Sequence, residues 1–390
     1  MASSSPPAAP APSPPPAFIS PSFPPPPQAP FLRRHAGKFL ASALIGIGLV
    51  AMLQKSGLKI LPTGVSFATI RWWTLPIYVV TLTGMNFFRA TRWRFLLRKV
   101  VDVPLRRLVI VSWIGFAAIL LMPFRLGEFV RPYMLRSGGK APGRDGQMQT
   151  ISLTMATGSV VAERVADLAY LSIVLAIALI FVPTVQPLPM SIVGLDVPLE
   201  RVRQAGFGML GLSAIAVTVI AVYYFAREWA RRATLAVFGL VSRPLGEKLA
   251  SMAEKFADGL HFLGHIGDAI PFLLETTAYW FLNVLGMWIL AWGCNVVHAD
   301  GTAITLAESC SLMGLLGVTI LVPGPPGLLG VFQLGIYAGM TMYYPESIVI
   351  QAGAAYVFLL YATQFIWTLV AGGGCLLLER NSVQTLKKGL

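Results

Sequence analysis

Charged side chains inside apolar stretches are the part of this sequence best suited to bind a ligand. Glu163 and Asp167 are four positions apart, so in a helix their carboxylates share one face and repel each other. Arg164 can neutralise Asp167, but Glu163 needs a cation from another segment. Because charged residues at membrane depth usually face a cavity or one another, we expect this cluster to lie at an internal site.

Two arginine-containing segments could supply the missing cation. Arg89 and Arg92 are three positions apart and share one helical face. Arg125, Glu128 and Arg131 follow one another at three-residue intervals inside a turn bounded by proline and glycine. Arginines in this arrangement can hold phosphate or carboxylate through paired hydrogen bonds, and Glu128 could hold them when no ligand is bound. The pattern predicts an anion site, and a purely structural ion-pair network is the alternative.

Two proline- and glycine-rich segments, 123–132 and 323–333, interrupt apolar stretches. Proline removes a backbone donor and glycine permits positive φ, so a helix cannot continue through either segment. A membrane tolerates the freed backbone groups only where the segment is buried in protein or faces a wet cavity. We therefore expect each to be the tip of a re-entrant hairpin, with Gln333 facing the same cavity as Glu128; ordinary turns between full spans are the alternative. The tip residues are Pro123, Gly127, Pro323, Gly324, Gly327 and Gly330.

The elements that must position these residues are membrane helices. Hydrophobic residues make up 55% of the 390-residue chain and charged residues only 12%, about half the usual charged share. Two shorter apolar stretches, 108–122 and 302–322, lead into the proline- and glycine-rich segments. The composition predicts an all-α polytopic membrane bundle with about six full spans and two re-entrant hairpins, or else eight spans. The six stretches long enough to cross a membrane are 38–54, 73–90, 158–182, 205–226, 270–297 and 348–377.

The distribution of basic residues predicts the orientation. Most of the 30 Lys and Arg residues lie in segments that are cytoplasmic if both termini are inside and each hairpin returns to the side it entered. Each half of the chain then contains two spans, a hairpin and a further span, which is the order expected of an inverted repeat. The segments expected in the cytoplasm are 1–37, 89–107, 123–157, 227–269 and 378–390.

Composition also divides the chain into three parts. Thirteen of the first 30 residues are proline, so we expect 1–37 to be a disordered cytoplasmic tail. Residues 38–378 form the membrane domain, and 379–390 form a second cytoplasmic tail. The net charge of +13 is explained by membrane orientation, and we expect no nucleic-acid partner.

The sequence contains few residues or motifs that are typical of an enzyme. His261 and His265 are four positions apart and could share a metal ion, but they lack a third ligand, and the three cysteines show no metal-ligand spacing. No GxSxG, HExxH or phosphate-binding loop motif occurs. We expect no catalytic residues, no metal and no cofactor, and therefore a protein that is not an enzyme.

Four motifs resemble those of one family. The lysylphosphatidylglycerol synthase transmembrane-region family, whose members are flippase-like membrane proteins, has similar segments, and the resemblance covers about 38–378. It implies a lipid-handling role, because in larger members this region moves an aminoacylated phospholipid between leaflets. Lipid aminoacylation is not implied, because no aminoacyl-transferase domain follows Leu390. Gln333 departs from the family, which often has an acidic residue there. The motifs are RATRWRFLL at 89–97, PFRLGEFVRPYMLR at 123–136, ERVADL at 163–168 and PGPPGLLGVFQ at 323–333.

Two functions from different classes follow from these observations. The first is a flippase-like transporter of the cytoplasmic membrane that binds the headgroup of an anionic phospholipid or polyprenyl-linked lipid. The second is a non-transporting accessory subunit that serves a membrane enzyme of lipid or glycan synthesis. In both cases the expected partners are membrane lipids. The residues expected to bind the headgroup are Arg89, Arg92, Arg125, Glu128, Arg131, Glu163, Arg164, Asp167 and Gln333.

Overall fold

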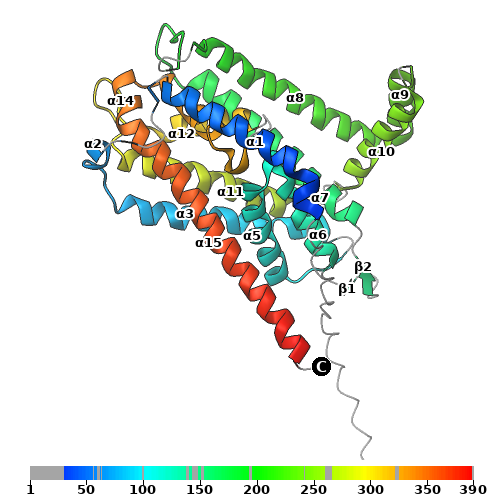
Figure 1. The fold of residues 1–390 in the computed structure, drawn as a ribbon. Helices are drawn as coiled ribbons and strands as arrows, with labels where there is room; N and C mark the ends of the chain where they lie inside the picture. The colour runs from blue at the N-terminus through cyan, green and yellow to red at the C-terminus, as the bar shows by residue number, and fades with distance from the viewer. Residues whose placement is uncertain are drawn as a thin grey trace, which may run out of the picture.

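The protein is a bundle of long helices (Figure 1). A two-stranded antiparallel hairpin of β1 (Lys140–Pro142) and β2 (Met148–Thr150) is a small addition to this helical fold. The predicted all-α membrane bundle is therefore confirmed. The structure is a computed structural model that describes residues 30–55, 57–58, 62, 64–98, 101–137, 140–142, 148–150, 153–192, 196–240, 242–259, 266–320 and 325–388.

Among the residues that the structure describes, four stretches of helix are long and apolar enough to cross a membrane. Many of their large apolar side chains are exposed, as expected of helices that face lipid rather than water. The chain is thus a polytopic membrane protein. The stretches are Ala156–Phe181, Leu199–Tyr223, Gly267–Gly293 and Glu346–Glu379. They lie in α7 (Leu153–Phe181), α8 (Leu199–Phe225), α11 (Ile266–Gly293), and α14 (Glu346–Ile350) with α15 (Ala352–Lys388).

The other two predicted spans are also helices, α1 (Pro30–Lys55) and α3 (Thr74–Thr91). Because α1 begins at Pro30, the predicted boundary of the tail at residue 37 is wrong for its last eight residues. Proline is favoured in the first turn of a helix, and residues 31–37 contain no further proline to stop it. The rest of the predicted tail, 1–29, lies outside the described residues. Most of the predicted C-terminal tail is helical, since α15 continues to Lys388, and its cytoplasmic location stays a prediction.

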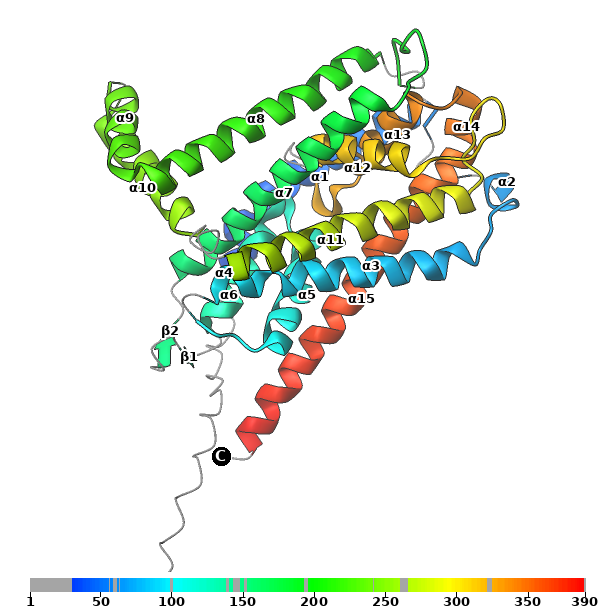
Figure 2. The same cartoon turned by 180° about the vertical axis from the view of Figure 1, so that it is seen from behind.

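Helices α3 and α11 lie side by side through the middle of the bundle (Figure 2). A glycine allows this close approach, because a Cβ atom at Gly286 would lie 2.4 Å from Oγ1 of Thr81. Tyr78 and Leu82 of α3 and Met287 of α11 belong to the same buried apolar core. This packing holds the charged C-terminal end of α3 at a fixed place against α11.

Both predicted hairpins are helix–break–helix units whose arms pack on each other. The breaks η1 and η3 also contact each other, so segments 200 residues apart in sequence meet inside the bundle. Gly327 and Gly330 have φ values of +69° and +87° in the second break, which a residue with a side chain rarely adopts. The first unit is α5 (Leu105–Leu121), η1 (Pro123–Phe129) and α6 (Val130–Ser137), and the second is α12 (Leu306–Ile320), η3 (Pro326–Leu328) and α13 (Val331–Thr341).

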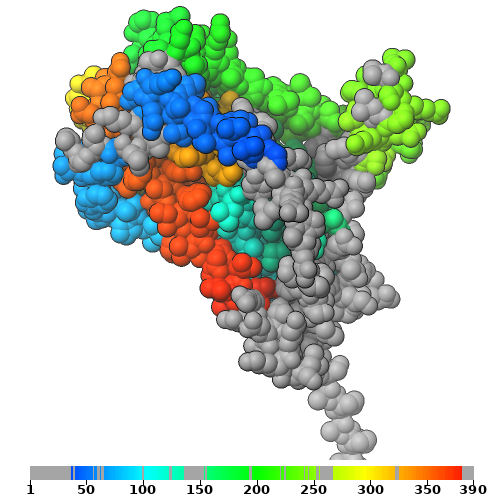
Figure 3. All heavy atoms as spheres, viewed as in Figure 1, coloured from blue at the N-terminus to red at the C-terminus, as the bar shows by residue number. Residues whose placement is uncertain are grey.

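The order of elements is the same in the two halves. Helices α1 and α3, the first hairpin and α7 are followed by α8 and α11, the second hairpin and α15. Helix α1 lies on the outside of the bundle, where it contacts η1, η3 and α13 (Figure 3). The remaining helices are the short α2 (Gly64–Phe67) and α4 (Trp93–Leu97), and the amphipathic pair α9 (Arg227–Gly239) and α10 (Arg243–Gly259).

Candidate functional site

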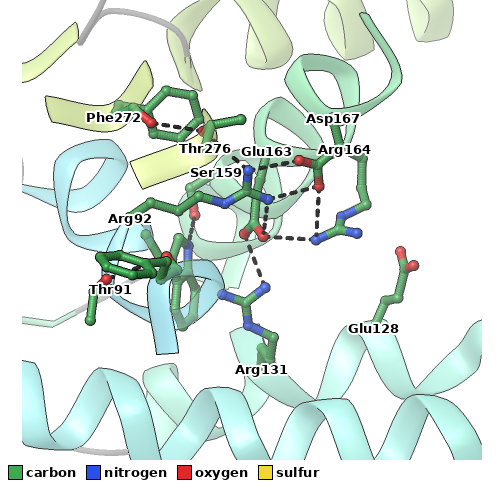
Figure 4. A network of polar contacts seen from close by, with 12 residues as sticks. Thr91, Arg92, Glu128, Arg131, Ser159, Glu163, Arg164, Asp167, Phe272 and Thr276 are labelled. Atoms are coloured by element: carbon green, nitrogen blue, oxygen red, sulfur yellow. Dashed lines mark hydrogen bonds and ion pairs between the residues drawn. The ribbon is translucent and has the colours of Figure 1, made fainter. Parts of the chain in front are cut away.

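Glu163 of α7 is the centre of a buried network of ion pairs (Figure 4). Its Oε1 atom accepts hydrogen bonds from Nη2 of Arg92 at 3.0 Å and from Nη2 of Arg164 at 2.7 Å. Its Oε2 atom accepts one from Nη1 of Arg131 at 3.0 Å. The Glu163 side chain is fully inaccessible to solvent. Three arginines from three different elements thus stabilise one buried carboxylate.

Arg92, at the C-terminal end of α3, binds protein groups through both of its terminal nitrogens. Its Nη1 atom lies 2.7 Å from Oδ1 of Asp167, and its Nη2 atom donates to Oδ2 of the same carboxylate at 2.8 Å. Nη1 also donates to Oγ1 of Thr276 in α11 at 3.2 Å. Arg92 therefore neutralises the repelling pair of carboxylates on α7, and it ties α3, α7 and α11 together.

Arg131 of α6 connects the first hairpin to the same network. Its side chain passes over Gly115 of α5, where a Cβ atom would lie 2.2 Å from Cγ of Arg131. The guanidinium then lies 4.3 Å from the centre of the Trp93 ring, and the Trp93 indole donates to Oγ of Ser159 at 2.9 Å. Arg131 is 1% exposed and points toward α7, so it does not form an anion clamp with Arg125. The predicted pairing of these two arginines is wrong.

Arg125 instead pairs with Glu128, as the spacing allows. Its Nε and Nη2 atoms lie 2.9 Å and 2.7 Å from Oε1 of Glu128. Both side chains are partly exposed, and Arg125 has a φ of +58°. Leu328 has the same φ in the second break. A positive φ at a non-glycine residue costs roughly 1–2 kcal/mol and is typical of functional sites.

A cavity of about 510 Å³ lies where the two breaks meet. Arg125 and Glu128 line it from η1, and Gly327 and Leu328 line it from η3. The charged residues of the lining also include Arg89, Arg164 and Asp167. The lining contains many apolar residues as well, among them Leu168, Leu171, Met287, Leu316, Ile320 and Phe332. The cavity can therefore hold a ligand with an anionic end and an apolar end.

Arg89 lies one turn before Arg92 but has a different environment. Its guanidinium carbon is 4.3 Å from the centre of the Phe116 ring and 6.0 Å from that of Tyr279. Within the described ranges, Arg89 forms no ion pair with a carboxylate, although the sequence made it a candidate partner of Glu163. Arg92, Arg131 and Arg164 fill that role instead.

Gln333 does not have the position that the sequence predicts. It is 2% exposed, and it is not among the described residues that line the cavity. Its Oε1 atom accepts a hydrogen bond from the backbone N–H of Gly330 at 2.7 Å, which caps the start of α13. The expectation that Gln333 faces the cavity together with Glu128 is wrong. Its side-chain amide stabilises the backbone of the second break instead.

The structure brings most of the predicted site residues together. Five arginines and three carboxylates gather around the cavity and the network beside it, which leaves two positive charges in excess. Arg92, Arg131 and Glu163 belong to the network and do not line the cavity itself. Of the predicted hairpin residues, Gly127 packs against α5, and a Cβ atom there would lie 2.2 Å from the carbonyl carbon of Ala118. Pro323, Gly324 and the side chain of Pro123 lie outside the described part of the structure.

Sequence reasoning missed the contribution of α11. Tyr279, Trp280 and Asn283 line the cavity, and Thr276 binds Arg92. Asn283 inside an apolar span is the signal that could have identified this face of the helix. In the part of the chain that the structure describes, no cluster of three or more His, Cys, Asp and Glu residues suits a metal ion.

Comparison with known proteins assigns most of the chain to a family. The model of the family described as the lysylphosphatidylglycerol synthase TM region matches residues 39–372. The match includes every element that lines the cavity, and it agrees with the resemblance found in the sequence motifs. No curated protein and no solved structure matches the chain significantly.

Proposed function

The chain belongs to the lysylphosphatidylglycerol synthase TM-region family, and from this premise we propose that it is a flippase-like lipid transporter. In this proposal the headgroup of a phosphate-bearing lipid binds in the cavity between the two helix breaks. The observation that carries the proposal is the mixed lining of the cavity, which combines Arg89, Arg125 and Arg164 with many apolar side chains. Guanidinium groups suit phosphate oxygens, and apolar side chains suit acyl or prenyl chains.

The size of the cavity defines how much of a lipid it takes. A volume of about 510 Å³ is that of a site for a drug-sized molecule. Such a site accommodates a headgroup and the first part of the attached chains, while the remaining chain length stays among the lipid-facing helices. This division applies equally to a two-chain phospholipid and to a polyprenyl-linked lipid, since both carry phosphate next to an apolar chain.

The repeated order of elements supports transport over simple binding. In transporters built from two related halves, interrupted helices meet near the midplane, and the halves alternately expose the site to each side. Here η1 and η3 belong to different halves and contact each other beside the cavity. We propose that the protein does no covalent chemistry, lies in the cytoplasmic membrane and has both termini in the cytoplasm.

The test uses the purified full-length protein and two tryptophan substitutions. Leu316→Trp fills the cavity, whereas Leu212→Trp adds the same ring at a side chain of α8 that is 56% exposed. We expect Leu316→Trp to lose co-purifying phospholipid in native mass spectrometry and to stop lipid movement in proteoliposomes. Leu212→Trp should behave as the wild type. Normal lipid movement in Leu316→Trp would contradict the proposal, and lipid binding without any movement would favour an accessory role.

A further inference from the structure

Among the five arginines near the cavity, Arg89 stands apart because it has no carboxylate partner within the described ranges. We propose that Arg89 is the main phosphate-binding residue of the cavity and that Arg164 is the second. This inference rests on the proposed function and assigns the binding of the lipid phosphate to one subsite, formed by Arg89 and Arg164. The ligand group is a phosphate monoester or diester.

Arg92, Arg125 and Arg131 already bind carboxylates of the protein. Arg92 binds both carboxylates of α7 and does not line the cavity. Arg131 is also away from the cavity lining, and it binds Glu163. Arg125 lines the cavity but is held by Glu128, so a ligand must compete with that carboxylate. Arg89 reaches the same cavity without such competition.

The charges around the cavity favour an anion between Arg89 and Arg164. Both guanidinium groups line the cavity and repel each other, while Tyr279, Glu163 and Asp167 act on Arg89 in the opposite sense. A phosphate placed between them would contact both cations and relieve the repulsion. Glu163 and Asp167 cannot do the same for Arg89, because they are bonded to Arg92 and Arg164.

Unused hydrogen-bond donors support the same placement. The Nε atoms of Arg89 and Arg164 and the Nε1 atom of Trp280 are buried and have no hydrogen-bond partner among the described residues. All three residues line the cavity, and Trp280 is 9% exposed. Buried donors normally have a partner, and a phosphate group carries several oxygens that can accept.

The aromatic neighbours of Arg89 hold its guanidinium in place. The planes of Phe116 and Tyr279 flank it at 4.3 Å and 6.0 Å, which restricts the group without occupying its hydrogen-bond donors. Lysine carries the same charge but lacks the planar fork of donors. Arg89→Lys should therefore bind phosphate more weakly than the wild type and more strongly than Arg89→Gln.

The experiment measures binding of defined probes to the full-length protein in detergent by native mass spectrometry. The probes are phosphatidylglycerol, diacylglycerol (which has no phosphate) and inorganic phosphate. Arg89→Gln should weaken phosphatidylglycerol binding about ten- to a hundredfold, the range for loss of charge-assisted hydrogen bonds. Diacylglycerol binding should not change. The control is Arg98→Gln, which removes an arginine side chain that is 63% exposed and should leave all binding unchanged.

Inorganic phosphate distinguishes the two sources of the ligand group. Competition with phosphatidylglycerol in the wild type but not in Arg89→Gln supports a subsite that also accepts free phosphate. Wild-type binding of the lipid without such competition supports a subsite that requires the lipid phosphodiester. Phosphatidylglycerol binding by Arg89→Gln at wild-type affinity would overturn the inference in either case.

Failure of this inference can be separated from failure of the proposed function. If Leu316→Trp loses phosphatidylglycerol while Arg89→Gln retains it, the cavity binds lipid but Arg89 is not its phosphate ligand. If Leu316→Trp also retains the lipid, the proposed function fails as well. If Arg89→Gln does not fold, Arg89→Lys replaces it as the test variant, because it keeps the positive charge. Wild-type affinity of folded Arg89→Lys for phosphatidylglycerol would overturn the role of the guanidinium fork.

Discussion

The guanidinium of Arg92 and the carboxylate of Glu163 meet at 3.0 Å with both side chains completely inaccessible to solvent. They come from α3 and α7, which are separated by the whole first hairpin. Isolated charges are very costly in such a place, so each needs the other to remain ionised. The pair therefore ties the fold together, and Arg89, which has no carboxylate partner within the described ranges, remains available for a ligand.

We predict that Arg92→Gln destabilises the protein strongly. The substitution removes a fully buried cation that contacts both Glu163 and Asp167 and leaves them with the partly exposed Arg164; removing one partner of a buried ion pair typically costs about 3–5 kcal/mol. Thermal unfolding in detergent should show a large fall in melting temperature and a reduced yield of folded protein. The matched control is Arg94→Gln, because Arg94 pairs with Glu275 but its side chain is 43% exposed. An equal loss of stability in both variants would contradict the structural role of Arg92.

Much of this network was predictable, because its members are charged residues in apolar surroundings. The repulsion between Glu163 and Asp167 indicated that cations must lie close by. The sequence could not identify those cations, since Arg131 reaches Glu163 only after the chain has reversed through η1. Arg125 lies in the 3₁₀ helix η1 and lines the cavity, whereas Arg131 lies in α6 and points toward Glu163 of α7.

We predict that Gly127→Ala disrupts the first hairpin. A Cβ atom at this position would lie 2.2–2.4 Å from the backbone of Ala118 and Ile119, which cannot move without displacing α5. Overpacking of this kind typically costs about 1–3 kcal/mol or more. The melting temperature should fall, and lipid binding should fall with it because Arg125 and Glu128 are moved. Gly48→Ala in α1 is the control, since a Cβ atom there meets nothing within 4 Å. A stable, lipid-binding Gly127→Ala would mean that η1 packs less closely on α5.

We predict that Gln333→Leu destabilises the second hairpin without acting on the ligand directly. The leucine cannot accept the hydrogen bond from Gly330, and a buried N–H without a partner costs about 1–3 kcal/mol. The melting temperature should fall, while the affinity of the remaining folded protein for phosphatidylglycerol should stay the same. Gln351→Leu removes an exposed glutamine and serves as the control. Reduced affinity at unchanged stability would instead place Gln333 in the binding site.

The errors of sequence reasoning concern local backbone geometry. Proline and glycine correctly located the breaks, because their effect on helix formation is local. The capping role of Gln333 depends on Gly330 adopting a φ of +87°, which no residue pattern specifies. Likewise, the helical ends of α1 and α15 contain polar and charged residues, so hydropathy placed the boundaries where apolar character stops.

The orientation of the chain gives the last prediction. If the first hairpin enters and leaves on the cytoplasmic side, single cysteines at Gly37 and Gly138 should react with a membrane-impermeant maleimide only after the cells are opened. A cysteine at Met190, which is 72% exposed between α7 and α8, should react in intact cells. The background variant needs Cys294, Cys310 and Cys375 replaced by alanine, because two of these are only partly buried. The contrast between positions 138 and 190 is decisive, since the described segment between them contains α7 as its membrane-length helix. Labelling of position 138 in intact cells would mean that α5 and η1 cross the whole membrane. The predicted orientation of every later element would then be reversed.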